Sequence, residues 1–208
     1  AIGKVLPYKF QREITLKDRS LVFSYIIENT GKESFKGFWS AHPLFHAVEG
    51  MQILINGNPP MTKEFSFSGR MGSDGVDGYA GHLDSYTWPN TVGESGRSYD
   101  LSQITLANPL TDKVVLAAPN DGEITLLNPR HKCAVRLSFD PQEIPFVGIC
   151  FNLNAWPFSG EKARWVAIEP STGPTDKLDE SDRMCEIRIF TPQGPVTFTF
   201  TITLSSLL

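Results

Sequence analysis

The stretch TFTFTITL, residues 197–204, alternates large apolar side chains with threonines. Successive side chains of a β-strand project to opposite faces, so Phe198, Phe200, Ile202 and Leu204 would share one face and the threonines the other. Aromatic and β-branched residues are also the types that pack well in sheets. The stretch therefore predicts a strand that buries one face in a core and leaves the other in solvent.

The same alternation recurs along the rest of the chain. Residues 20–29 set Leu21, Phe23, Tyr25 and Ile27 on one face, and residues 133–139 repeat the pattern. Turn-like segments rich in Gly, Pro, Asn and Asp separate such stretches, and no window carries a long apolar stripe at helical spacing. The predicted fold class is all-β, a large antiparallel β-sandwich. Further strands are expected at residues 8–16, 36–42, 51–56, 64–68, 114–118, 122–127, 147–154, 165–169 and 184–190.

The organisation of the chain is that of one unit. No internal repeat and no flexible linker interrupts the pattern, so residues 1–208 are expected to form a single domain. Two long connections stand out, a glycine-rich one at 69–97 and a polar one at 169–184. The first is expected to be an excursion between strands, and loops of that length are usually functional or mobile.

Composition excludes several classes of partner. The net charge is −4 and no basic run is longer than a pair, whereas nucleic acids and anionic membranes need clustered Lys and Arg. The sequence has no apolar run of membrane-spanning length and no signal-peptide pattern. Cys133, Cys150 and Cys185 are widely spaced, which favours reduced thiols of a cytoplasmic protein over a disulfide frame or a zinc site.

The segment FWSAHPLFHA, residues 38–47, places His42 directly before a proline. A residue before proline is restricted to extended backbone, and proline cannot donate to a sheet ladder, so His42 is expected at a strand end or edge. Alternation places Phe38, Ser40 and His42 on one face of that strand. Two interpretations remain open: a histidine hydrogen-bonded at the sheet rim, or a proton donor.

A carboxylate occupies the same kind of position later in the chain. Glu169 directly precedes Pro170 at the end of the predicted strand 165–169. Trp165, Ala167 and Glu169 share one face of it, and Val166 and Ile168 take the other. A carboxylate on an apolar strand is suited to proton transfer, and the alternative is an acceptor for the turn that follows.

A third strand offers groups that suit a sugar. In VGICFNLNAWPF, residues 147–158, alternation places Asn152, Asn154 and Trp156 on one face. Amides can bond hydroxyls edge-on, and an indole gives a flat apolar platform for the C–H face of a pyranose. The competing interpretation is an ordinary exposed strand face.

Taken in order, FWSAHPLF and AIEPSTGPTD, preceded by YKFQREITL…SLVFSYIIENTGKESF, resemble the aldose 1-epimerase (galactose mutarotase-like) family. More specifically, they resemble its divergent, poorly characterised branch of aldose epimerases, and the resemblance covers essentially the whole chain. Members usually have a longer N-terminal part, so the resemblance implies that this chain corresponds to the C-terminal portion and lacks N-terminal strands of the sandwich. The missing segment or a homodimer partner would then complete the fold.

The resemblance also implies roles for particular residues. His42 matches the family's general acid, Glu169 its general base, and Asp100 in RSYDLS its sugar-binding aspartate. Where many members have an asparagine before the acid histidine, this chain has Ala41, which weakens any claim to galactose specificity. Neither a metal nor an organic cofactor is implied. Alternation turns Trp39 away from His42, so the residues expected to complete the sugar site are Phe45, Asn152 and Trp156.

The residue patterns and the family resemblance leave three functions open. The first is a mutarotase that interconverts the α and β anomers of a monosaccharide or sugar phosphate by ring opening and reclosure. The second is a non-catalytic carbohydrate-binding or sensing protein, and the third is an accessory sandwich domain. Retention of both His42 and Glu169 favours the first over the third. A phosphosugar would need a cationic pocket, for which Arg136 and Arg164 are the candidates.

Overall fold

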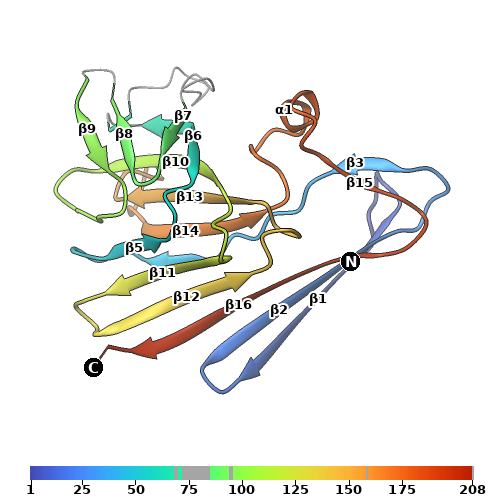
Figure 1. Ribbon diagram of the computed structural model, residues 1–208, viewed down its shortest axis with the longest axis horizontal. Helices are drawn as coiled ribbons and strands as arrows, with labels where there is room; N and C mark the ends of the chain where they lie inside the picture. Colours follow the sequence, from blue (N-terminus) through green and yellow to red (C-terminus); the bar gives the residue numbers. More distant parts are fainter. Residues whose placement is uncertain (68–69, 72–84, 94–95, 158, 208) are drawn as a thin grey trace.

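The computed structural model describes residues 1–67, 70–71, 85–93, 96–157 and 159–207. Two large β-sheets form the body of the molecule, and a two-stranded sheet and one short helix lie at one end (Figure 1). Among the described residues the strands of each sheet pair antiparallel throughout, and an isolated bridge from Leu110 to Asn154 is parallel. The architecture confirms the all-β antiparallel prediction.

The first sheet has six strands and contains the stretch 197–204. That stretch lies in β16 (Val196–Ser206), which pairs with β2 on one side and β12 on the other. Phe198 and Phe200 are buried, and their rings stack on Trp39 at 4.9 Å and Phe23 at 4.7 Å between centroids. The order across the sheet is β1 (Tyr8–Lys17), β2 (Ser20–Asn29), β16, β12 (Cys133–Phe139), β11 (Glu123–Asn128) and β5 (Gln52–Ile55).

The second sheet has eight strands and carries the residues of most functional interest. Strands β13 and β14 within it are hydrogen-bonded along their full lengths, with Gly148 opposite Glu169 and Asn152 opposite Trp165. The order across the sheet is β4 (Leu44–His46), β14 (Arg164–Ser171), β13 (Phe146–Leu153), β10 (Leu110–Ala117), β6 (Pro60–Phe67), β7 (Ser85–Thr87), β8 (Asn90–Val92) and β9 (Ser98–Asp100). The small sheet pairs β3 (Phe35–Gly37) with β15 (Arg188–Phe190).

The core lies between the two large sheets. Phe151 and Ile168 of the eight-stranded sheet are fully buried in the same hydrophobic cluster as Phe198 and Leu126 of the six-stranded sheet. Because side chains alternate along a strand, the neighbours of these residues on β13 and β14 project from the opposite, outer face of the eight-stranded sheet. That outer face carries the candidate site.

The core-facing side of the six-stranded sheet continues beyond the buried cluster. Leu16 and Leu21 lie opposite each other on β1 and β2, on the same face as the buried Tyr25 and Ile27, yet they are 73% and 38% exposed. Leu204 continues the face of Phe198 on β16 and is 50% exposed. An apolar strip of this sheet is therefore left in solvent near the far ends of β1, β2 and β16.

Three predicted segments differ from the structure. The expected strand 36–42 is shorter in the structure: β3 ends at Gly37, and the residues up to Pro43 make only a bridge from Ser40 to Ser171 and single backbone hydrogen bonds to β14 before β4 begins at Leu44. The expected strand 184–190 contracts to β15, since α1 (Leu178–Arg183) precedes it. The predicted excursion 69–97 contains β7 and β8, and residues 72–84 within it fall outside the described part.

Helix α1 was not predicted, because it is only six residues long and has no apolar stripe at helical spacing. Its acidic residues Asp179 and Glu180 occupy the first turn and Arg183 the last, the arrangement that the helix dipole favours. Within the part of the chain that the structure describes, no helix has both the length and the apolar character needed to span a bilayer.

Candidate active site

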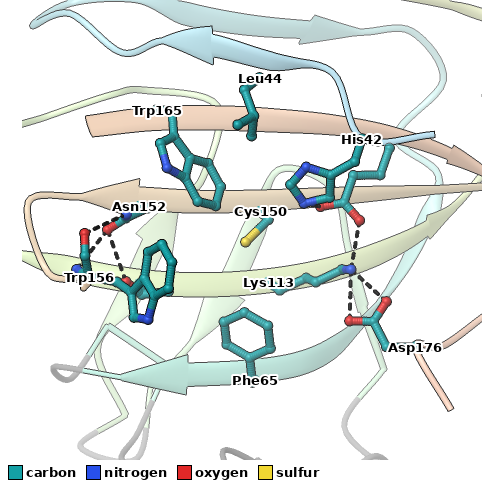
Figure 2. A pocket seen from close by; sticks show the side chains of 11 residues that line it. His42, Leu44, Phe65, Lys113, Cys150, Asn152, Trp156, Trp165 and Asp176 are labelled. Carbon is teal, nitrogen blue, oxygen red and sulfur yellow. Dashed lines mark hydrogen bonds and ion pairs between the residues drawn. The ribbon is translucent and has the colours of Figure 1, made fainter. Parts of the chain in front are cut away.

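A cavity of about 600 Å³ opens on the outer face of the eight-stranded sheet. Its walls combine four acidic or basic side chains with three aromatic rings, and Figure 2 shows both sets around one hollow. Side chains from neighbouring strands and from adjoining loops contribute. The lining residues are His42, Leu44, Phe65, Thr111, Lys113, Cys150, Asn152, Trp156, Trp165, Glu169 and Asp176.

Strand register explains why residues so far apart in sequence meet here. Phe65, Lys113, Cys150, Ala167 and Leu44 lie opposite one another in a row across β6, β10, β13, β14 and β4. A second row, two residues along, consists of Thr111, Asn152 and Trp165. Residues in one row and residues two apart on a strand share a face, so the floor of the pocket is built by sheet pairing alone.

Three charged groups form a chain at one end of the floor. The Lys113 ammonium donates to Glu169 Oε2 at 2.7 Å and to both carboxylate oxygens of Asp176, at 2.6 and 2.8 Å. The side chains of Lys113 and Glu169 are only 6% and 4% exposed, whereas Asp176 is 53% exposed. A buried carboxylate is tolerated in this position because it has a cation in direct contact.

Gly148 makes room for this ion pair. It lies directly opposite Glu169 on β13, where any larger residue would project between the two charged side chains. A Cβ atom at this position would lie 3.1 Å from Glu169 Oε2 and 3.2 Å from Lys113 Cε, closer than most real Cβ contacts. The absence of a side chain at Gly148 therefore lets Lys113 reach diagonally from its own row to Glu169.

Lys113 keeps its charge in spite of its burial. Burial by itself lowers the pKa of a lysine, but the adjacent Glu169 and Asp176 carboxylates favour the ammonium form more strongly, and the net effect is a raised pKa for Lys113. This side chain is a fixed positive charge at neutral pH rather than a proton donor.

His42 approaches the other oxygen of Glu169. Its Nε2 lies 3.1 Å from Glu169 Oε1, and its ring packs edge-on against Trp165 at 6.0 Å between centroids. The imidazole is 55% exposed, so it faces the opening of the pocket. The two groups are close but not aligned as a hydrogen bond, and Glu169 Oε1 has no hydrogen-bond partner among the described residues. An acceptor in this state is available to a hydroxyl group of a ligand.

A buried glutamate fixes the loop that supplies Asp176. Glu64 Oε1 accepts hydrogen bonds from Thr175 Oγ1 at 2.9 Å and from the Asp176 backbone N–H at 3.1 Å. Desolvation raises the pKa of Glu64 above its ordinary value, and the two hydrogen bonds from the loop oppose that effect. Glu64 thus holds the loop against β6, with Asp176 turned toward Lys113.

The side-chain amide of Asn152 forms hydrogen bonds within the protein and offers little to a ligand in the pocket. Its Oδ1 accepts from the Trp156 backbone N–H at 3.0 Å and from Thr111 Oγ1 at 3.3 Å, and its Nδ2 donates to the Trp156 carbonyl at 2.9 Å. The residue is fully buried. Its amide therefore fastens the segment after β13 and places the half-exposed Trp156 ring at the edge of the pocket.

The structure brings together four of the residues that the sequence singled out. The pocket is lined by His42, Glu169, Asn152 and Trp156. The amide group of Asn152 is already hydrogen-bonded to the backbone of Trp156. Trp165, which alternation placed on the face of Glu169, also lines it.

The other two lie elsewhere. Phe45 is opposite Val166 on β14 and packs against the core, so its neighbour Leu44 reaches the pocket instead. Alternation in fact continues across Pro43, since the Ser40–Ser171 bridge and the Leu44–Ala167 pair have the same register. It therefore places Leu44 on the face of His42 and Phe45 on the core face with Trp39, a count that the expectation for Phe45 did not apply. Asp100 lies on β9, at the edge of the sheet remote from β14, and accepts from Ser102 N–H and Oγ at 2.9 and 2.6 Å.

Two charged residues of the site were not predicted from the sequence. Lys113 precedes the strand expected at 114–118, and the true strand begins at Leu110, which places this lysine on the face of Thr111. Asp176 stands in a polar loop in which no single carboxylate is distinctive. A lysine directly before the apolar run VVLAA, residues 114–118, was the signal available for the first.

The two arginines considered for a phosphate group do not line the pocket. Arg136 lies on the six-stranded sheet and pairs with Glu123 at 3.4 Å. Arg164 is at the start of β14, and its Nη2 is 3.1 Å from His46 Nε2. The cation that does line the pocket, Lys113, is balanced by two carboxylates.

Comparison with known proteins establishes the fold. No protein-family model and no curated protein sequence matches this chain. Solved structures do match. A proposed aldose 1-epimerase from Escherichia coli K12 gives a TM-score of 0.70 at 14% identity, over 100% of this chain and 63% of that one. A galactose mutarotase related enzyme from Lactobacillus acidophilus gives 0.65 at 16% identity, over 97% of this chain and 62% of that one.

A TPR-domain containing protein from Parabacteroides distasonis also matches, with a TM-score of 0.67 at 10% identity, over 98% of this chain and 31% of that one. The chain therefore has the galactose mutarotase-like fold, as its sequence resemblance implied, and spans 63% and 62% of the length of the first two structures. Because one fold carries different functions, the function must be argued from the pocket.

Proposed function

We propose that this chain carries the acid–base site of an aldose 1-epimerase-type isomerase, with His42 as general acid and Glu169 as general base. The observation that carries the proposal is the approach of the His42 imidazole to within 3.1 Å of a buried Glu169 oxygen that has no hydrogen bond from the described residues. Both groups face an open pocket with aromatic walls. Acid and base in such proximity suit a substrate whose two reacting oxygens are bonded to one carbon.

The anomeric centre of an aldose is such a substrate. Glu169 would remove the proton from the C1 hydroxyl while His42 donates a proton to the ring oxygen, and the bond between C1 and the ring oxygen breaks to give the open aldehyde. After rotation about the C1–C2 bond, His42 takes the proton from the C5 hydroxyl as this oxygen attacks C1, and Glu169 returns a proton to the carbonyl oxygen. The reaction balances without an oxidant, reductant or cofactor.

Lys113 would serve this reaction as a positioning residue. By holding Glu169 Oε2 at 2.7 Å it fixes the carboxylate with Oε1 turned toward His42. Its own charge is compensated by Asp176, so the pocket does not become strongly cationic. This balance favours a neutral sugar over a sugar phosphate.

A non-catalytic sugar-binding protein is the second candidate, and one observation favours it. Glu169 Oε2 is held by the buried Lys113 ammonium at 2.7 Å, so one of its two carboxylate oxygens is already engaged by the protein. The sugar would then bind through the same pocket without turnover.

Polarimetry separates the two candidates. Freshly dissolved α-D-glucose and α-D-galactose should lose their excess optical rotation faster with the wild-type chain than in buffer. The variants Glu169→Gln and His42→Gln should each lose about 10²–10⁴-fold of this acceleration while remaining folded, since a positioned acid or base contributes that much. Retention of the wild-type rate by Glu169→Gln would refute the assignment. Sugar binding by the wild-type chain without acceleration would favour the second candidate.

A further inference from the structure

The two ends of the pocket differ in chemistry. Figure 2 shows His42, Lys113 and Asp176 gathered at one end and Trp156 with Asn152 at the other, with Cys150 on the floor between them. The ion pairs of Glu169 place it at the first end, which we call the charged end. The opposite part, lined by Trp156 and Trp165 and bordered by Phe65 from the row of Cys150, is called the aromatic end.

Hydrogen-bonding capacity at the aromatic end is small. Thr111 and Asn152 bond to each other, and Asn152 also bonds to the backbone of Trp156. Burial raises the pKa of the Cys150 thiol, which keeps it neutral and a weak hydrogen-bonding group. Of the described side chains there, the indole N–H groups of Trp156 and Trp165 are the main polar groups left, and an indole can only donate.

An ordinary hexose fits such a pocket poorly. Its ring carries hydroxyl groups on C3 and C4 and a hydroxymethyl group on C5. At this end each of these hydroxyl groups would lose hydrogen bonds to water and contact aromatic or aliphatic carbon instead. The C–H faces of a sugar pack well on aromatic rings, and so do methyl and alkyl groups. A cavity of about 600 Å³ is also in the range that holds ligands larger than one monosaccharide, so a substituent has room.

We propose that the substrate is an amphipathic aldose, one in which apolar groups replace hydroxyl groups on the side of the ring remote from C1. This inference rests on the proposed function for the orientation of the sugar: C1 and the neighbouring C2 hydroxyl lie at the charged end, beside Glu169 and His42. The deoxygenated or alkylated positions then lie on Trp156, Phe65 and Trp165. Deoxy, O-alkyl and acylated aldoses share this chemistry.

A series of deoxy sugars tests the orientation and the class together. Isothermal titration calorimetry with the wild-type chain compares D-glucose with its 2-deoxy, 4-deoxy and 6-deoxy analogues. The 4-deoxy or the 6-deoxy sugar is expected to bind about tenfold more tightly than glucose, because one fewer hydroxyl is desolvated against carbon. The 2-deoxy sugar is expected to bind about tenfold more weakly, because it loses a hydroxyl at the charged end. Equal or weaker binding of both remote deoxy sugars overturns the proposal.

Matched variants locate the effect. Trp156→Ala should reduce the preference for the remote deoxy sugar to less than about threefold without disturbing the segment, since Asn152 holds residue 156 through its backbone. Leu54→Ala, an exposed apolar position on the six-stranded sheet, should leave the preference unchanged. A preference that survives Trp156→Ala, Phe65→Ala and Trp165→Ala would place the apolar contact elsewhere and overturn the proposal.

Calorimetry also separates this inference from the proposed function, because binding is measured without turnover. A clear preference for the remote deoxy sugar in the absence of anomer interconversion would support the amphipathic ligand and reject the isomerase. Rapid interconversion with glucose as the preferred ligand would do the reverse. Failure of all four sugars to bind would overturn the inference.

Discussion

One face of strands β13 and β14 is buried in the core, and the other lines the pocket. Toward the six-stranded sheet, Phe151 and Ile168 are fully buried among apolar side chains. On the other face, Cys150, Trp165 and Glu169 line an open pocket. Because the two sets alternate along the same strands, one hydrogen-bonded ladder positions both of them. The stability of the fold and the chemistry of the site are thus carried by the same backbone but by different side chains.

Truncation on the core face should have the largest effect on folding. Phe151→Ala removes a fully buried ring and its contact with the Arg70 guanidinium, 4.5 Å from the ring centroid. The free energy of unfolding is expected to fall by about 3–5 kcal/mol in urea denaturation. Trp165→Ala, on the pocket face of the neighbouring strand, should lose clearly less stability and weaken sugar binding. Equal losses of unfolding free energy from Phe151→Ala and Trp165→Ala would contradict the distinction between the core face and the pocket face.

Removal of the buried cation should give an intermediate effect on the pocket face. Lys113→Met leaves the Glu169 carboxylate buried without its cation, and the expected loss is about 3 kcal/mol, at the lower end for a broken buried pair because Asp176 can turn to solvent. The double variant Lys113→Met with Glu169→Gln should recover at least about 1 kcal/mol of this, since no buried charge then remains unpaired. A double variant as unstable as the sum of the single variants would contradict the ion pair.

The smallest predicted effect concerns the loop that completes the pocket. Since the folded state holds the proton of Glu64 more tightly than the unfolded chain does, ionisation of Glu64 reduces stability as the pH rises above its ordinary pKa of 4.5. Glu64→Gln keeps an acceptor for Thr175 and removes this titration. Its stability relative to wild type should therefore increase as the pH rises from about 4.5 to 7. A difference that is constant with pH would show that Glu64 does not titrate in this way.

Much of the fold was predictable because the sequence alternates wherever a strand has one buried face. The stretch 197–204 is the clearest case, and β16 has the predicted inner face of Phe198 and Phe200. The same reasoning placed Trp165 and Glu169 on one face and Val166 and Ile168 on the other, which is the core face in the structure. Alternation also continues across Pro43 and places Leu44 beside His42, whereas the expectation for Phe45 did not follow it.

The rest of the site depends on contacts between distant strands. Lys113 meets Glu169 only because β10 and β13 are adjacent and Gly148 leaves a gap, and neither fact is local in sequence. Asp176 reaches Lys113 because Glu64, on another strand, holds its loop. Asn152 lay on the predicted face, but its role in fastening Trp156 depends on backbone geometry after the strand.

Exchange NMR of the anomeric protons tests the central claim most directly, because it observes ring opening and closure at equilibrium. With an equilibrated aldose that binds the pocket, the wild-type chain should produce exchange cross-peaks between the α and β anomeric protons. Glu169→Gln should remove these cross-peaks, while Phe151→Ala, at temperatures where it remains folded, should retain them. Cross-peaks of equal intensity with wild type and Glu169→Gln would contradict the assignment of the chemistry to the pocket face.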